Sequence, residues 1–225
     1  MSLETYTEKA KFYDNYRENC PGWGECVDLL KNNYNKILDL GCGTGVFTEK
    51  IIEYINVRDE KIKGNNAIFK EIHALEPNSQ MFKKTLKRLC EIFSDKKFKD
   101  DENFNFSETE IEYIVNLNPK IKLINDFLHN TNNSDYDLIL CSQVLQNITT
   151  DLDEAAKVRK HFFKDIFNRL ISGGQLILMT RNKSENNDYS NMYWYADKDI
   201  CPKSVNHMNN IIPSNLVSEL KEIRF

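Results

Sequence analysis

A short apolar segment that ends in a glycine-rich turn constrains the fold of this chain most strongly. Residues 36–40 read Lys-Ile-Leu-Asp-Leu, and residues 41–45 read Gly-Cys-Gly-Thr-Gly. An apolar run of this length before a glycine turn is typical of a buried parallel strand, and a helical pattern follows from Val46 to Tyr54. Glycine lets the backbone pass close to a ligand. The segment therefore predicts a strand, a ligand-binding loop and a helix, in that order.

The same alternation of strand and helix continues along the chain. Charged residues at 57–66 predict a loop, and Gly173 with Gly174 predicts the end of a helix. Alternating strands and helices imply a mostly parallel sheet that is covered on both faces, with ligands beyond the carboxyl ends of its strands. We therefore expect a doubly wound α/β fold. Further strands are predicted at 72–76, 121–126, 136–141 and 175–180, and further helices at 79–93 and 151–171.

Composition favours one soluble domain of 225 residues with an acidic balance, because the net charge is −4 and hydrophobic residues make up 40%. A nucleic-acid-binding chain usually has a basic face, so nucleic acid is disfavoured as a partner. The basic run Lys83, Lys84, Lys87 and Arg88 is interpreted as a solvated helix face.

Residues 1–20 have no secretory pattern and no apolar run could span a bilayer, so we expect a cytoplasmic protein with reduced thiols. The six cysteines and four histidines lack metal-ligand spacing, and no metal is expected.

Two kinds of cofactor suit a glycine loop in this position. A nicotinamide dinucleotide site has the pattern Gly-x-Gly-x-x-Gly, but the sixth position here is Val46. Asp39 lies two residues before the first glycine, where a carboxylate is unfavourable beside a pyrophosphate and suits a cofactor with an amino group. Both observations favour S-adenosylmethionine over a dinucleotide.

The segment from Ile37 to Gly45 resembles motif I of the class I S-adenosylmethionine-dependent methyltransferases almost residue for residue. Four later segments resemble the family in the same order, and they are 75–78, 125–127, 136–146 and 169–176. In the family, the acidic residue after the second strand binds the ribose hydroxyls, and the one after the third strand meets the adenine amino group. The resemblance thus implies cofactor contacts by Asp39, Gly41, Cys42, Gly43, Gly45, Glu76, Pro77, Asp126, Phe127, Cys141, Ser142 and Gln143.

Four parts of the chain depart from the family's pattern or define its acceptor side. Glu76 lies far from the glycine loop, which the charged segment 57–66 explains as an insertion. The family ends with two further strands, which we expect to be missing here because the last helix is predicted from Ile212 to Glu222 and only residues 223–225 follow it. Either the chain is cut short or its sheet is closed differently. Residues 1–34 are interpreted as a helical lid and 181–212 as an acceptor-side insertion of a single domain, present as a monomer or weak dimer.

Methyl transfer from a sulfonium requires no enzyme nucleophile, so positioning of the acceptor dominates. No catalytic residue is assigned, and Cys42 and Cys141 are interpreted as small packing residues. An aromatic N-terminal segment, a Glu-Pro pair and a long segment after the fifth strand are loosely similar to small-molecule methyltransferases, histamine N-methyltransferase-like ones included. The function expected is methylation of a small molecule at N or O. The alternatives are a protein or RNA methyltransferase and a catalytically inactive binding module. Candidate acceptor-binding residues are Tyr13, Tyr16, Gln146, Tyr193 and Trp194.

Overall fold

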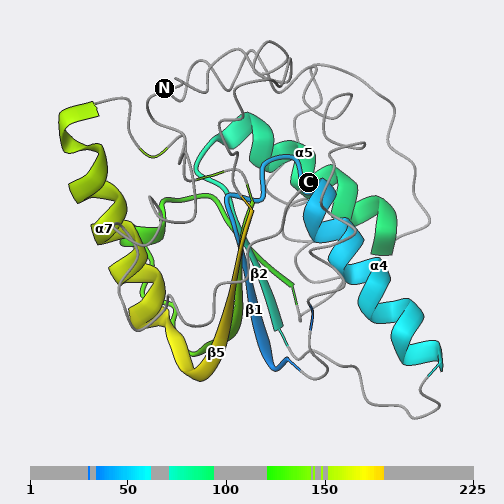
Figure 1. Cartoon of the computed structure of the whole chain (residues 1–225). Helices are drawn as coiled ribbons and strands as arrows, with labels where there is room; N and C mark the ends of the chain where they lie inside the picture. Colours follow the sequence, from blue (N-terminus) through cyan, green and yellow to red (C-terminus); the bar gives the residue numbers. More distant parts are fainter. Residues whose placement is uncertain are drawn as a thin grey trace, which may run out of the picture. The chain divides into compact units, whose positions relative to one another are not determined.

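The computed structural model of the chain describes residues 30, 34–61, 71–93, 121–142, 144, 148 and 152–179. Five strands form one sheet in the order β3-β2-β1-β4-β5, with helices after β1, β2 and β4 (Figure 1). This is the doubly wound, Rossmann-like arrangement that the sequence predicts. The elements are β1 (Lys36–Leu40), α4 (Val46–Lys61), β2 (Glu71–Leu75), α5 (Ser79–Phe93), β3 (Ile121–Ile124), η1 (Leu128–Asn130), β4 (Tyr136–Ser142), α7 (Leu152–Arg169) and β5 (Leu170–Met179).

The described residues fall into two compact units, one that ends at residue 132 and one that begins at residue 133. In the first unit, β1 pairs with β2 and β2 pairs with β3, both in parallel. Each connection between parallel strands is right-handed by rule, and two successive crossovers in one direction put both helices on one face. Figure 1 shows α4 and α5 on the same side of β1 and β2. The cores of these elements include Ile37, Leu38, Ile51, Ile52, Ile72, Ala74, Met81, Leu86 and Leu89, all buried.

Helix α4 extends to Lys61, so the predicted loop is wrong for residues 57–61. The segment is charged but contains no helix breaker before Gly64. Arginine, glutamate and lysine are good helix formers, and polarity alone does not end a helix. Residues 62–70, where the rest of the predicted loop lies, are outside the described part of the chain.

In the second unit, β4 pairs with β5 in parallel, and α7 contacts β5. The expected helix end at Gly173 and Gly174 is wrong, because α7 ends at Arg169 and Leu170 already pairs with Tyr136. The next register pair is Leu138 with Gln175, so the residues between bulge out of β5. Gly173 has φ of 77°, which an L side chain rarely adopts, and this explains a glycine within the bulge.

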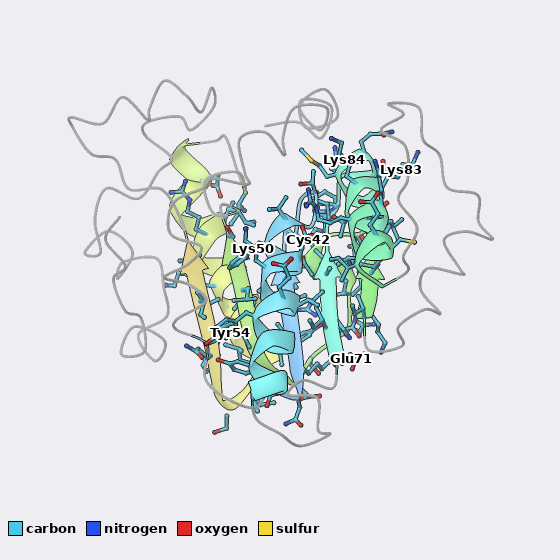
Figure 2. All side chains as sticks on the ribbon, turned by 90° about the vertical axis from the view of Figure 1, so that its right-hand side faces the viewer. Cys42, Lys50, Tyr54, Glu71, Lys83 and Lys84 are labelled. Carbon is cyan, nitrogen blue, oxygen red and sulfur yellow. The ribbon has the colours of Figure 1, made fainter. Side chains whose placement is uncertain are left out.

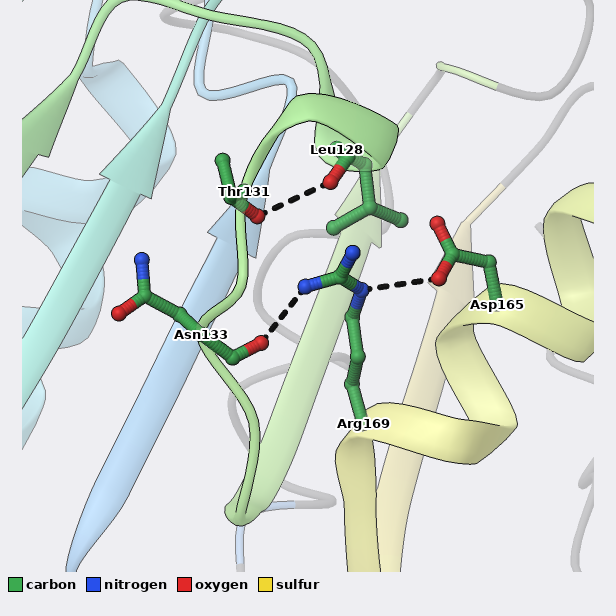
Figure 3. Close-up of polar contacts among 5 residues, drawn as sticks. All are labelled: Leu128, Thr131, Asn133, Asp165 and Arg169. Carbon is green, nitrogen blue, oxygen red and sulfur yellow. Dashed lines mark hydrogen bonds and ion pairs between the residues drawn. The ribbon is translucent and has the colours of Figure 1, made fainter.

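Arg169 fixes the end of α7 within this unit (Figure 3). Its Nε donates to Oδ1 of Asp165 at 3.0 Å, and its Nη1 donates to the Asn133 carbonyl oxygen at 2.6 Å. Arg169 is 9% exposed but the Asp165 side chain is 34% exposed, so the bonds are partly shielded from water. The side chain thereby ties the last turn of α7 to the segment that leads into β4.

Several predicted features fall outside the described residues. They are the N-terminal lid except for residues 30 and 34, the acceptor-side insertion at 181–212 and the predicted C-terminal helix. The expected absence of two final strands therefore stays a prediction, as does the single-domain organisation. Among the helices that the structure describes, none combines the length and the hydropathy that a membrane span requires.

Candidate cofactor-binding site

The glycine loop lies between the end of β1 and the start of α4, and its conformation requires glycine at three positions. Gly41, Gly43 and Gly45 have φ of 71°, 62° and 80°, in the left-handed region that L side chains disfavour. The N–H groups of Gly41 and Cys42 donate to the Leu75 carbonyl oxygen at 2.8 and 3.0 Å. The alternating glycines of the sequence are therefore explained by the backbone itself, and the loop continues the pairing of β1 with β2.

Asp39 is buried beneath this loop at the end of β1, with 1% of its surface exposed. Its Oδ2 accepts a hydrogen bond from the hydroxyl of Thr48 in the first turn of α4. Burial raises the pKa of Asp39 to about 6, and the bond from Thr48 partly opposes the rise. Asp39 therefore joins the strand before the loop to the helix after it.

Glu76 follows β2 directly and is the second buried carboxylate, 8% exposed. The Gly43 N–H donates to its Oε2 at 3.0 Å, and the Asn78 N–H donates to its Oε1 at 2.8 Å. Burial raises the pKa of Glu76 to about 7, against the opposing effect of these two backbone bonds. The side chain predicted from the Glu-Pro motif thus contacts the glycine loop itself, although 33 residues separate it from Gly43.

The ends of β2 and β3 are joined by further bonds. The Glu76 N–H donates to the Ile124 carbonyl oxygen at 3.0 Å, and Nδ2 of Asn125 donates to the Glu76 carbonyl oxygen at 2.7 Å. Asn78 caps α5, because its Oδ1 accepts from the N–H groups of Gln80 and Met81 at 3.1 and 3.0 Å. Pro77 lies half-buried between Glu76 and this cap. The backbone around Glu76 is therefore fixed on both sides.

Asp126 and Phe127 follow β3 and are more accessible than the two buried carboxylates. Oδ1 of Asp126 accepts from the Phe127 N–H and from Nδ2 of Asn130, both at 2.7 Å. The bond from Asn130 and then that from Phe127 hold the pKa of Asp126 below its usual value. The ring of Phe127 is 41% exposed and stacks on His129 with centroids 5.5 Å apart. An ionised carboxylate and an exposed aromatic ring are thus adjacent at this strand end.

Two side chains of α5 contact the loop and were not predicted from the sequence. The Thr85 hydroxyl donates to the Gly43 carbonyl oxygen at 2.8 Å, and Nε of Arg88 donates to the Thr44 carbonyl oxygen at 3.1 Å. Arg88 also pairs with Glu49 in α4, so it is not part of a merely solvated basic face. Thr85 could have been identified from the sequence, because it is a polar residue on the apolar side of an amphipathic helix. Arg88 gave no such signal.

Figure 2 shows Cys42 at the end of the sheet opposite Glu71, which begins β2. Cys42 is buried with its Sγ 3.7 Å from the Thr85 hydroxyl oxygen, consistent with a packing role, and burial raises the pKa of its thiol. In the second unit, Cys141 is buried in β4 and Ser142 is half-buried at its end. Gln143 and all five candidate acceptor-binding residues lie outside the described part of the chain. They are Tyr13, Tyr16, Gln146, Tyr193 and Trp194.

The first unit brings Asp39, Glu76 and Asp126 to the ends of three parallel strands that are joined by hydrogen bonds. This set of groups offers carboxylate oxygens, which accept hydrogen bonds from hydroxyl and amino groups and repel phosphate. Hydroxyl and amino groups of a ligand could therefore be bound at these strand ends. Among the described residues, no group of three or more His, Cys, Asp or Glu is arranged for a metal ion.

Comparisons with known proteins show the family and the fold of the chain. A curated relative, malonyl-[acyl-carrier protein] O-methyltransferase 1 of Ilyobacter polytropus, is 24% identical over 79% of this chain, which spans half the length of that relative. The N-methyltransferase NodS of Bradyrhizobium japonicum has a similar fold, with a TM-score of 0.52, 13% identity and coverage of 88% of this chain and 83% of NodS. The mitomycin 7-O-methyltransferase MmcR has a TM-score of 0.51 at 12% identity, covering 89% of this chain and 48% of MmcR. A family model described as a methyltransferase domain matches residues 14–223. The chain therefore belongs to the methyltransferase-domain family, with the fold and glycine loop of the class I S-adenosylmethionine-dependent enzymes.

Proposed function

We propose that this chain catalyses methyl transfer from S-adenosylmethionine to a nitrogen or oxygen atom of a small-molecule acceptor. The observation that carries the proposal is the contact between the glycine loop and Glu76, whose buried carboxylate accepts the Gly43 N–H at 3.0 Å. This contact places an acceptor for hydroxyl groups directly against a loop whose backbone can approach a ligand closely.

We assign the binding of the cofactor to residues at three strand ends. Glu76 would accept hydrogen bonds from the ribose hydroxyls, because a carboxylate keeps further lone pairs after accepting two backbone bonds. Asp126 would accept from the adenine amino group, with Phe127 beside it. Asp39 would hold the loop and attract the amino group of the methionine moiety. When bound, S-adenosylmethionine supplies an electrophilic methyl group on a sulfonium.

The protein's contribution to the reaction is to position the acceptor in line with that methyl group and to exclude water. A general base is needed only for an acceptor that loses its proton before or during attack. The net charge of −4 supports a small-molecule acceptor over a nucleic acid. The curated relative adds one acceptor to test, malonyl-[acyl-carrier protein], which is the substrate named for that protein.

Isothermal titration calorimetry of the purified chain with S-adenosylhomocysteine, with NADH as the control, tests which cofactor the chain binds. We expect saturable binding of the former at one site and none of NADH. An acceptor screen with radiolabelled S-adenosylmethionine follows, using amines, phenols, carboxylates, malonyl-[acyl-carrier protein], RNA and protein substrates. Transfer to RNA or protein alone would replace the proposed acceptor class. Cofactor binding without transfer to any class would support an inactive binding module instead.

A further inference from the structure

The side of the glycine loop that faces α5 is held by two side chains one helical turn apart. The Thr85 hydroxyl donates to the Gly43 carbonyl oxygen at 2.8 Å, and Nε of Arg88 donates to the Thr44 carbonyl oxygen at 3.1 Å. Positions i and i+3 lie on the same face of a helix, so one face of α5 binds two consecutive carbonyl groups of the loop. These contacts span 42 and 44 residues of sequence.

Holding a carbonyl oxygen also orients the next amide. In a trans peptide the C=O and the following N–H point in opposite directions, and none of the described peptide bonds is cis. Thr85 therefore directs the Thr44 N–H away from α5. The neighbouring amides are directed as well, since the Gly43 N–H donates to Glu76 and the Gly45 N–H donates to the Cys42 carbonyl oxygen at 2.9 Å. The direction of each of these loop amides is thus set by a named contact.

Thr85 also fills the space directly beneath the loop. It is 0% exposed, and a Cβ added to Gly45 would lie 3.0 Å from its Cγ2 and 3.2 Å from its Cα. Its hydroxyl can accept from the Cys42 thiol, 3.7 Å away, while donating to Gly43. One small side chain therefore contacts Cys42, Gly43 and Gly45 together. Threonine suits this position because its hydroxyl bonds to Gly43 while its methyl group packs beside Gly45.

Arg88 connects the same loop to α4. Its Nη1 pairs with Glu49, and the Glu49 N–H donates to the Gly45 carbonyl oxygen at 2.9 Å. The guanidinium is half-buried, which shields its bond to Thr44 in part from water. The end of the loop is therefore held from the side by Arg88 and along the chain by the first turn of α4.

We propose that Thr85 and Arg88 are positioning residues, which hold the glycine loop in its cofactor-binding conformation before the cofactor arrives. The proposal rests on the function proposed above. A loop that is already ordered loses less conformational freedom on binding, so its ligand binds more tightly. Removing the Thr85 hydroxyl therefore weakens cofactor binding through the loop, without removing any group that touches the cofactor.

The test compares Thr85→Val, which keeps the shape and removes the hydroxyl, with Thr85→Ser, which keeps the hydroxyl and removes the methyl group. We expect Thr85→Val to raise the Kd for S-adenosylhomocysteine about tenfold, and Thr85→Ser to change it by less than about threefold. Arg88→Met should raise the Kd several-fold. Lys87→Met removes the same charge from the adjacent position and should leave the Kd unchanged.

Amide hydrogen exchange of the ligand-free protein provides a second measurement that does not depend on cofactor binding. A peptide covering residues 41–47 should exchange faster in Thr85→Val than in Thr85→Ser or the wild type. If the wild type binds no S-adenosylhomocysteine, the proposed function fails, and the exchange comparison still decides the role of Thr85. The inference is overturned if Thr85→Val exchanges like the wild type. It is also overturned if Thr85→Val keeps the wild-type affinity while Thr85→Ser loses it, because Thr85 would then act only through packing.

Discussion

Substituting Gly45 by alanine tests the conformation of the loop against a matched glycine elsewhere in the chain. Gly45 has φ of 80°, and an added Cβ would lie 3.0 to 3.3 Å from three atoms of Thr85. Gly173 has nearly the same φ, 77°, but an added Cβ there has nothing within 4 Å. The two variants therefore share the backbone strain and differ in the steric overlap.

The expected magnitudes follow from these two contributions. An L residue in the left-handed region costs about 1–2 kcal/mol, so Gly173→Ala should lower the free energy of unfolding by about that amount. Overlap in a well-packed region costs about 1–3 kcal/mol more, so Gly45→Ala should lose about 2–5 kcal/mol in total. Gly45→Ala should also weaken binding of S-adenosylhomocysteine, whereas Gly173→Ala should not.

Urea denaturation followed by circular dichroism measures both free energies of unfolding, and a common m-value shows that the comparison is valid. Calorimetric titration supplies the two Kd values. Equal losses of stability in Gly45→Ala and Gly173→Ala would refute the reasoning, because the close approach of α5 to the loop would then have no energetic effect.

Three further substitutions test the carboxylates and the end of α7. Because the pKa of Glu76 is raised from 4.5 to about 7, the folded protein holds this proton more tightly than the unfolded chain. Protonated Glu76 therefore stabilises the folded protein fully below pH 4.5. This stabilisation, roughly 3 kcal/mol of the free energy of unfolding at most, is lost as the pH rises through 7. Glu76→Gln should flatten this dependence in urea denaturation at pH 5 and pH 8, and an unchanged slope would contradict the assigned burial. Asp39→Ala should raise the Kd for S-adenosylhomocysteine at least about tenfold in calorimetry, and an unchanged Kd would show that the site assignment is wrong. Arg169→Met leaves Asp165 and the Asn133 carbonyl without these bonds, so urea denaturation should show a loss of about 2–3 kcal/mol with cofactor affinity unchanged.

The sequence predicted where the strands lie because strands of a parallel sheet are short, mostly apolar and followed by turn residues. Residues 36–40 form such a strand, and of the strand predicted at 121–126 the structure has residues 121–124. The errors came from residues whose local meaning is ambiguous. The charged end of α4 resembles a loop by polarity although its helix propensity is good, and Gly173 resembles a helix cap although it lies in a strand bulge.

The sequence motifs identified the glycine loop and Glu76, but they did not predict the side chains that hold the loop and the backbone of Glu76 in place. The alternating glycines were identifiable because the backbone conformation favours glycine there, and Glu76 was identifiable because its segment resembles the family. The contacts of Thr85, Arg88 and Asn125 depend on tertiary packing between segments more than 40 residues apart, for which a single sequence has no periodic signal. The ligand contacts assigned to Asp39, Glu76 and Asp126 stay predictions that the substitutions above test.

The bonds around the glycine loop also have a consequence for the order in which the chain folds. Gly43 receives its partners from residues 33 and 42 positions later, and Glu76 receives Asn125 from 49 positions later. Contacts of such long range form only after the entropy of closing each loop has been overcome, which slows folding. On the ribosome, a nascent chain that has emerged only as far as α4 contains the complete glycine motif but none of these partners. The side-chain partners of the loop become available only after β2 and α5 have been synthesised, and the bonds that fix the backbone of Glu76 become available only after β3.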